Sequence, residues 1–203
     1  MKISHIFFDL GKVLVDFDFD IAVREVLKKS PLSPEQLNQE MYRTYGLIDE
    51  YECGRIGSEA FFQGLKEEYR YTGEATELRD IWCGVFTPLD NHILMARSLA
   101  EFYPLAIISN TSEAHISHLE STYDFFPVFR KRIYSYQVGI MKPDYAIYAH
   151  ALEEMQADKY ESLFIDDREE NIQAAASRGW QTIHLRPDVS LRDALRSYEL
   201  RGV

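Results

Sequence analysis

Short apolar segments rich in branched and aromatic side chains recur along the chain, and each runs into polar residues. They are ISHIFFDL (3–10), YPLAIISN (103–110), ESLFIDD (161–167) and WQTIHL (180–185). Segments with helical spacing lie between and after them, such as NHILMARSLAEF (91–102) and REENIQAAASRG (168–179), whose final glycine suits a helix C-cap. Strands that alternate with helices predict an α/β fold with a Rossmann-like, doubly wound parallel sheet covered by helices on both faces.

The region from residue 19 to about residue 90 breaks this alternation, because it contains several helix patterns in succession. The segment SPEQLNQEMYRTYG places Ser33 at an N-cap, Pro34 in the first turn and Gln36 in a capping box. The segment SEAFFQGLKEEY offers Ser58 as another N-cap.

These successive helices predict a small all-helical cap inserted after the first strand. We expect the cap to span residues 16–90 and the Rossmann-like core to consist of residues 1–15 and 91–203. Four aromatic residues at helical spacing are expected to pack inside the cap: Tyr42, Tyr45, Phe61 and Phe62.

The composition fits one sizeable core with a smaller unit attached, since 46% of the 203 residues are hydrophobic and 27% are charged. A net charge of -11 argues against nucleic acid or an anionic membrane as a partner, because either requires a concentrated basic face. Cys53 and Cys83 lack the CxxC spacing of a metal site and fit a reducing compartment. With neither a signal peptide nor a membrane span indicated, we expect a cytoplasmic protein, either a monomer or a homodimer.

Polar side chains follow the predicted strands at the place where parallel sheets bind ligands, beyond the carboxyl ends of the strands. They are Asp9 after the first strand, Ser109, Asn110 and Thr111 after the second, Asp166 and Asp167 after a later one, and Lys142 in the loop GIMKPDYAIY. Grouped carboxylates raise one another's pKa unless a cation intervenes, and Mg²⁺ prefers such oxygen ligands. Each residue alone is more common as a turn or helix-capping residue, but their shared placement favours a site that binds a cation and an anion.

Four segments together carry a family resemblance. FFDLGKVLVD, IISNTS, GIMKPD and FIDDREEN resemble the four motifs of the haloacid dehalogenase-like hydrolase superfamily, over about residues 5–186, and the helical insertion is similar to its first-type cap. Within the superfamily, DLGKVLVD and ECGRIGSEAF resemble the bacterial branch of the glucose-1-phosphatase type, which is related to the N-terminal phosphatase domain of soluble epoxide hydrolase.

The resemblance implies a Mg²⁺-dependent phosphatase acting on a small phosphorylated metabolite such as a sugar phosphate. Asp9 would attack the phosphorus and form an aspartyl-phosphate that water then hydrolyses. Ser109 and the Asn110 amide would bind the phosphoryl oxygens, and Lys142 would neutralise charge on the phosphoryl group and on Asp9. The implied Mg²⁺ ligands are Asp9, the backbone carbonyl of Gly11, Asp167 and, directly or through water, Asp166. Asn171 either orients the two Asp residues or belongs to a helix N-cap network.

Gly11 departs from the superfamily pattern, because phosphatases of this kind usually carry a second Asp there. That Asp protonates the leaving oxygen and then activates water, a role typically worth about 10²- to 10⁴-fold in rate. Asp16 and Asp18 are the nearest carboxylates in the sequence, and substrate hydroxyls or a cap residue are further candidates for the role. Two alternatives stay open: a 2-haloacid dehalogenase, which uses the same nucleophile without a metal, and a non-catalytic protein that binds a phosphorylated metabolite.

Overall fold

The computed structural model describes residues 2–203 and contains a five-stranded sheet with the strand order β5-β4-β1-β6-β7. The strands are β1 (His5–Phe8), β4 (Leu105–Ser109), β5 (Lys131–Tyr134), β6 (Ser162–Asp166) and β7 (Gln181–His184). Every neighbouring pair is parallel, with β1 in the centre. The four apolar segments of the sequence are confirmed as β1, β4, β6 and β7, whereas β5 escaped the apolar pattern because its sequence KRIY begins with two charged residues.

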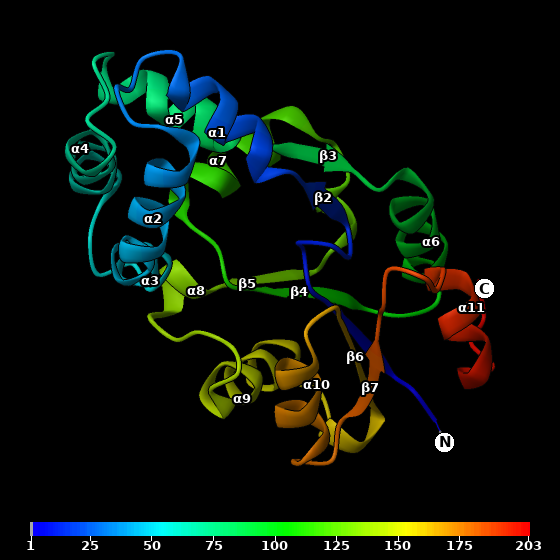
Figure 1. Ribbon diagram of the computed structural model, residues 1–203. Coiled ribbons are helices and arrows are strands. Elements are labelled where there is room, and N and C mark those ends of the chain that lie inside the picture. The colour runs from blue at the N-terminus through cyan, green and yellow to red at the C-terminus, as the bar shows by residue number, and fades with distance from the viewer. Residues whose placement is uncertain (1) are drawn as a thin grey trace.

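Helices cover both faces of this sheet (Figure 1). On one face lie α6 (Asp90–Ala100), α7 (Glu113–Thr122) and α11 (Leu191–Leu195), and on the other lie α9 (Tyr145–Met155) and α10 (Glu169–Ala176). The arrangement confirms the predicted doubly wound α/β fold. Within residues 2–203, none of the helices combines the length and apolar character needed to cross a bilayer.

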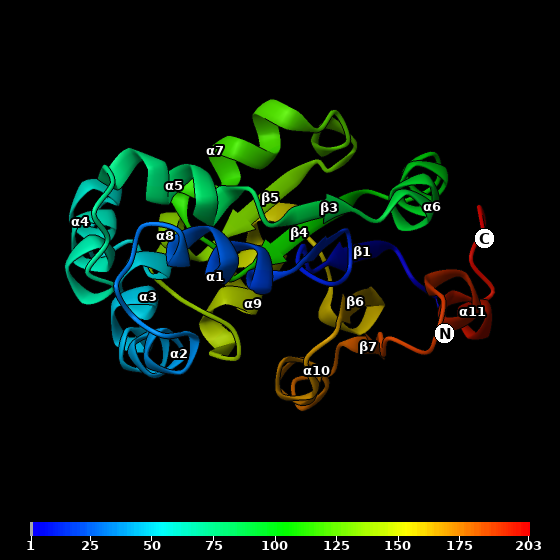
Figure 2. The same cartoon turned by 45° about the horizontal axis from the view of Figure 1, so that its top comes forward.

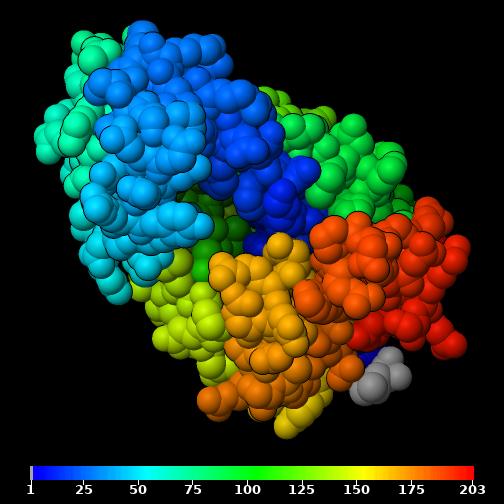
Figure 3. Space-filling view, in the orientation of Figure 1, coloured from blue at the N-terminus to red at the C-terminus, as the bar shows by residue number. Residues whose placement is uncertain are grey.

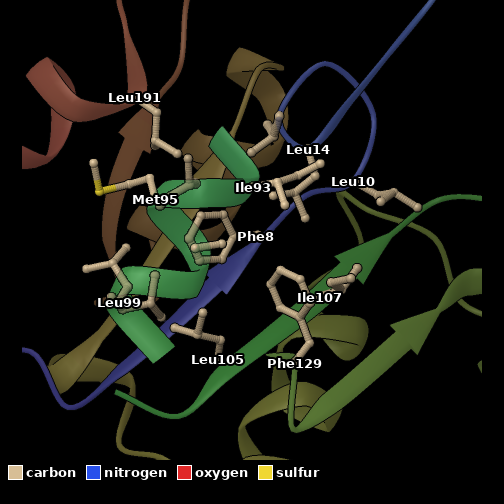
Figure 4. Packing of buried hydrophobic residues seen from close by; sticks show 14 of the residues in the cluster. Phe8, Leu10, Leu14, Ile93, Met95, Leu99, Leu105, Ile107, Phe129 and Leu191 are labelled. Carbon is tan, nitrogen blue, oxygen red and sulfur yellow. The ribbon is translucent and has the colours of Figure 1, made fainter. Parts of the chain in front are cut away.

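Alternation along the strands divides the core between the two faces, as the two-residue period of a strand requires. Phe8 and Ile107 are fully buried against α6, whereas Phe7 and Ile108 belong to the cluster under α9 and α10. Leu99 of α6 lies beside Leu105 and Phe8 in this packing (Figure 4). Burial of these apolar side chains is the main favourable contribution to the stability of the sheet core.

Five helices lie between two short strands that follow β1. The strands β2 (Val15–Phe17) and β3 (Phe86–Pro88) pair antiparallel as a two-stranded ribbon. The helices are α1 (Phe19–Leu27), α2 (Pro34–Arg43), α3 (Tyr45–Glu52), α4 (Ser58–Glu68) and α5 (Ala75–Cys83). We refer to residues 18–85 as the helical insertion, which groups on one side of the molecule, away from α6 and α11 (Figure 2).

The helical insertion has its own cluster of buried side chains, which includes Tyr51, Phe61, Phe62 and Trp82. Phe61 and Phe62 therefore pack as expected. Tyr42 and Tyr45 do not, because α2 and α3 turn these two side chains outward, with exposures of 71% and 57%. The division into a core of residues 1–15 and 91–203 and a cap of residues 16–90 stays a prediction.

The ends of three helices test the capping patterns. Ser33 caps α2 with the predicted capping box: its hydroxyl accepts a hydrogen bond from the Gln36 backbone at 3.2 Å, and Gln36 Oε1 accepts one from the Ser33 backbone at 2.8 Å. The prediction for Ser58 is wrong by one residue, since Gly57 is the N-cap of α4. The glycine prediction for α10 is also displaced, because Ser177 is its C-cap and Gly179 follows with a φ of 98°.

Truncation of Leu99 tests the packing of α6 on the sheet. Leu99→Ala is expected to lower the free energy of unfolding by about 2–5 kcal/mol, because it leaves a cavity in a fully buried position. Leu94→Ala, on the same helix but 62% exposed, is the matched control and is expected to change it by no more than about 0.5 kcal/mol. Urea denaturation measures both variants, and equal losses would contradict the packing.

Candidate active site

The acidic residues predicted to form a site meet at the carboxyl ends of β1 and β6. Asp9 directly follows β1, Asp166 ends β6 and Asp167 is the next residue. The backbone N–H of Asp9 donates to the carbonyl of Ile165 at 2.8 Å, which fixes Asp9 beside the end of β6. As a result, Asp9, Asp166 and Asp167 each present a carboxylate oxygen within 4.8 Å of the other two.

Lys142 lies between two of these carboxylates. Its Nζ is 2.8 Å from Asp9 Oδ1 and 2.7 Å from Asp166 Oδ2, and its side chain is only 2% exposed. The side chain of Asn110 makes two hydrogen bonds with the backbone of Lys142, donating to its carbonyl at 2.8 Å and accepting from its N–H at 2.7 Å. Asn110, just after β4, thereby holds the loop that carries Lys142 against the sheet.

Burial and pairing act against each other on the pKa values of this group. Burial alone lowers the pKa of Lys142, but the carboxylates of Asp9 and Asp166 outweigh it and hold that pKa above its usual value. Burial raises the pKa of Asp9, and the Lys142 ammonium opposes part of that rise. The buried ammonium therefore stays protonated, and it favours the charged form of Asp9 against the effect of burial.

Asp166 has both carboxylate oxygens occupied by protein donors. Its Oδ1 accepts from the Arg168 backbone at 2.8 Å, its Oδ2 accepts from Lys142 at 2.7 Å, and Asn171 Nδ2 donates to both oxygens at 3.0 Å. Of the two roles that the sequence left open for Asn171, the structure shows contact with one member of the Asp pair, Asp166. Asp166 is thus fixed in place by four contacts.

Asp167 is in a different position, half-buried next to Asp166. Burial raises the pKa of Asp167, and the charge of Asp166 adds to that rise. The raised pKa at both Asp9 and Asp167 comes first from burial, and the charge of Asp166 adds to it at both residues. The donor set consists of hard carboxylate oxygens, which fits a divalent cation such as Mg²⁺. Asp9 and Asp167 are the residues that would hold such an ion, and Gly11 lines the same cavity.

A cavity of about 400 Å³ opens above these residues, within the size range of small-molecule sites. It lies between the helical insertion, coloured blue to cyan, and the segments coloured yellow to orange, where the surface is hollowed (Figure 3). The sheet contributes Asp9, Ser109, Lys142 and Asp167 to its wall. All the predicted site residues therefore line this cavity, except Asp166, which is fully buried beneath it.

One face of α3 forms the opposite wall of the cavity. The sequence patterns did not indicate this face as part of the site. Tyr45, Ile48, Asp49 and Glu52 line the cavity at spacings of three, four and seven residues from Tyr45, which place them on one side of the helix. The spacing is visible in the sequence, but which side of α3 faces the sheet depends on packing. His115 was also not expected there: it stacks on Trp82 with ring centroids 5.3 Å apart, and burial lowers its pKa to about 3.

The two carboxylates nearest to Gly11 in the sequence have local structural roles. Asp16 pairs with Lys12 and is half-exposed, and Asp18 caps α1 by accepting from the Asp20 backbone at 2.9 Å. Neither side chain lines the cavity. At Gly11 itself, a Cβ would lie 3.1 Å from the ring of Phe17, so a longer side chain would require this ring to move.

Replacement of Lys142 tests the buried ion pairs. Lys142→Met leaves Asp9 and Asp166 buried without their cation, and it is expected to lower the free energy of unfolding by about 3–5 kcal/mol near neutral pH. Burial raises the pKa of Asp9 above its unfolded value, and loss of the ammonium increases that rise, so stability is lost as the pH rises through the folded pKa. The deficit should be larger at pH 8 than at pH 5 in urea denaturation with chelator present. Equal deficits at both pH values would contradict this electrostatic role.

Comparisons with known proteins identify the family of the chain. The family model described as haloacid dehalogenase-like hydrolase matches residues 3–179. The D-ribitol-5-phosphate phosphatase of Bacteroides thetaiotaomicron is 28% identical over 190 residues, which make up 89% of this chain and 90% of that protein.

Two solved structures share the fold. A wild-type HAD family enzyme from Bacteroides thetaiotaomicron, in complex with magnesium and inorganic phosphate, has a TM-score of 0.80 at 24% identity, covering 93% of this chain and 97% of that one. The L-2-haloacid dehalogenase from Xanthobacter autotrophicus has a TM-score of 0.67 at 18% identity, covering 96% of this chain and 81% of that one. Since the family model spans most of the sequence, as the four motifs predicted, the chain belongs to the haloacid dehalogenase-like hydrolases.

Proposed function

We propose that the protein is a Mg²⁺-dependent phosphatase that hydrolyses a small phosphorylated metabolite, in the class of sugar and sugar-alcohol phosphates. The observation that carries the proposal is the grouping of Asp9, Lys142 and Asp167 in the wall of one cavity. Together they supply a carboxylate nucleophile, a buried ammonium and a second carboxylate suited to a cation.

Asp9 is the nucleophile of the proposed reaction. Its carboxylate attacks the phosphorus, the bond to the leaving oxygen breaks, and water later hydrolyses the aspartyl-phosphate. A phosphate ester and a carboxylate repel each other, and the Lys142 ammonium, 2.8 Å from Asp9 Oδ1, offsets that repulsion. When bound, Mg²⁺ supplies further positive charge at the same place.

Ser109 and Asn110 have different proposed roles, although the family resemblance implied phosphoryl binding for both. The Ser109 hydroxyl is buried beside the cavity and has only a long contact of 3.3 Å with the Asn110 carbonyl, so it is available to donate to a phosphoryl oxygen. The Asn110 side chain is engaged with the backbone of Lys142. We infer that Asn110 supports phosphate binding by positioning Lys142.

The proposed metal site consists of Asp9, Asp167 and the carbonyl of Gly11. Asp166 holds Lys142 and is in turn held by Asn171 and the Arg168 backbone, so all its strong acceptor positions are taken. We infer that Asp166 supports the site as a positioning residue and contacts the ion through water if at all.

The substrate class is supported by the size of the cavity and by the relative from Bacteroides thetaiotaomicron. A cavity of about 400 Å³ accommodates a sugar phosphate or a sugar-alcohol phosphate. A protein that is 28% identical over nearly the whole chain is a phosphatase of D-ribitol 5-phosphate. A metal-independent dehalogenase needs no cation ligand beside its nucleophile, so a donor set that fits Mg²⁺ favours the phosphatase.

Substitution of the nucleophile tests the reaction. The wild-type protein with Mg²⁺ is expected to release phosphate from 4-nitrophenyl phosphate and from members of a panel of sugar and sugar-alcohol phosphates. Asp9→Asn should abolish this release, because an amide does not form the acyl phosphate. Asp124→Asn, at an exposed position in an ion pair with Arg97, is the control and should keep wild-type activity.

Each open alternative predicts a different result. Equal phosphate release by wild type and Asp9→Asn would refute the mechanism. Chloride release from 2-chloropropionate in the presence of chelator would favour the dehalogenase instead. Calorimetric binding of a sugar phosphate without any phosphate released over a long incubation would favour the non-catalytic binding protein.

Substitution of Asp167 tests the metal site. Asp167→Asn removes one of the two carboxylates assigned to Mg²⁺ and should raise the Mg²⁺ concentration needed for half-maximal activity by at least about tenfold. Calorimetric titration of Mg²⁺ into each protein gives a second measure that needs no turnover. The same Mg²⁺ affinity in variant and wild type would remove Asp167 from the metal site.

A further inference from the structure

The proposed reaction needs a proton donor that the segment around Asp9 does not contain. A sugar hydroxyl leaves poorly as an alkoxide, so a general acid speeds the first step and the same group can activate water in the second. Gly11 has no side chain for this role, and Asp16 and Asp18 do not line the cavity. The donor must therefore come from another part of the cavity wall.

Few titratable groups in the wall remain available. Asp9, Lys142 and Asp167 have the roles described above, and Lys12 and Arg168 pair with Asp16 and Glu170. Burial lowers the pKa of His115 to about 3, so its ring is neutral near pH 7 and is not a general acid there. The titratable groups left are all on α3: the exposed Tyr45 and Asp49 and the half-buried Glu52, which is the least exposed of the three.

Glu52 is the last residue of α3 and lies on the face of the helix that lines the cavity. Across residues 2–203, no side chain or backbone group makes a hydrogen bond with its carboxyl group. Other acids near the site are engaged: Asp166 accepts four hydrogen bonds from three donor groups, and Glu113 accepts from Ser58. A carboxyl group without a protein partner at the edge of a cavity is available to a ligand.

The backbone around Glu52 is fastened to the sheet core near the end of β4. The Ser135 hydroxyl donates to the Glu52 carbonyl at 2.6 Å and accepts from the Thr111 backbone at 2.9 Å. Two residues later, Gly54 packs so closely on the carbonyl of Tyr136 that a Cβ there would lie 2.1 Å from its oxygen. On the other side, the Tyr51 hydroxyl accepts from the Ala114 backbone at 3.1 Å.

These contacts fix the position of Glu52 relative to Ser109, which is two residues before Thr111 at the end of β4. The Glu52 backbone is thus attached to the same strand end as Ser109, and both residues line the cavity. Such attachment is what a proton donor requires, since proton transfer needs hydrogen-bonding distance to the leaving oxygen.

The surroundings of Glu52 suit a group that both gives and takes a proton near neutral pH. Burial raises the pKa of Glu52 to about 7, and the charges of Asp49 and Asp9 add to this effect. The cations that face it, Arg168 and Lys142, counteract part of the rise. A pKa near the working pH gives both protonation states an appreciable population.

We propose that Glu52 is the general acid and base of this site, in place of the side chain absent at Gly11. The proposal rests on the phosphatase function proposed above. As Asp9 bonds to phosphorus and the bond to the leaving oxygen breaks, Glu52 gives its proton to that oxygen and an alcohol departs. Glu52, now a carboxylate, then takes a proton from the water that attacks the aspartyl-phosphate, phosphate leaves, and Asp9 is regenerated as a carboxylate.

The test compares two substrates whose leaving groups differ in their need for a proton. Phenyl phosphate has a poor leaving group, whereas 2,4-dinitrophenyl phosphate has one that departs without protonation. Glu52→Gln is expected to slow the first turnover of phenyl phosphate by about 10²- to 10⁴-fold and that of 2,4-dinitrophenyl phosphate by only a few-fold. Later turnovers of 2,4-dinitrophenyl phosphate should then be slow, giving a rapid burst of one dinitrophenol for each active site.

Asp49→Asn is the matched comparison, since it makes the same change of charge one turn earlier on the same face of α3. Any effect of Asp49→Asn should be equal for the two leaving groups and show no burst. If Glu52→Gln slows the first turnover of both substrates equally, or of neither, the proposal for Glu52 is wrong. A wild-type protein that hydrolyses neither substrate, or an active Asp9→Asn, would instead reject the phosphatase function itself.

Discussion

The ammonium of Lys142 between the carboxylates of Asp9 and Asp166 is the interaction on which the rest of the site depends. Removing three charges from water is expensive, and their attraction compensates only when the geometry is accurate and the remaining hydrogen bonds are satisfied. The fold meets both conditions. Parallel strands β1 and β6 place the two carboxylates side by side, and Asn110 and Asn171 satisfy the polar groups around them.

The cavity therefore has two sides with different properties. The side formed by the sheet is rigid and highly charged, and its groups act on the phosphoryl group in the proposed reaction. The side formed by α3 and the β2–β3 ribbon is more apolar, with Phe17, Ile48 and Phe86 in its wall. Tyr45, Asp49 and Glu52 are polar groups on this side, and in the proposed reaction Glu52 serves the leaving oxygen. Ser135 connects the two sides through hydrogen bonds to both.

The sequence predicted those parts of the fold and site that depend on local patterns. Apolar runs located the largely buried strands β1, β4 and β6 and the less buried edge strand β7, and the polar residues after β1, β4 and β6 located the sheet side of the cavity, because the ends of parallel strands converge. The edge strand β5 was not predicted, because its sequence begins with two charged residues. Ser58 fits an N-cap pattern, but its hydroxyl forms hydrogen bonds with Tyr51 of α3 and Glu113 of α7. These contacts depend on tertiary packing. Glu52 was not predicted as a site residue for a related reason, since tertiary packing decides which side of α3 faces the sheet.

The ribbon of β2 and β3 has a consequence for how proteins of this architecture can diversify. Val15 pairs with Pro88 and Phe17 with Phe86, so the chain leaves the sheet core and returns to it at adjacent points. To the core, everything between Phe17 and Phe86 is equivalent to the loop of a hairpin. Helices other than α3 can be lengthened, shortened or exchanged within that loop without shifting Asp9, Lys142 or Glu52, so the choice of substrate can evolve while the groups of the proposed phosphoryl transfer stay in place.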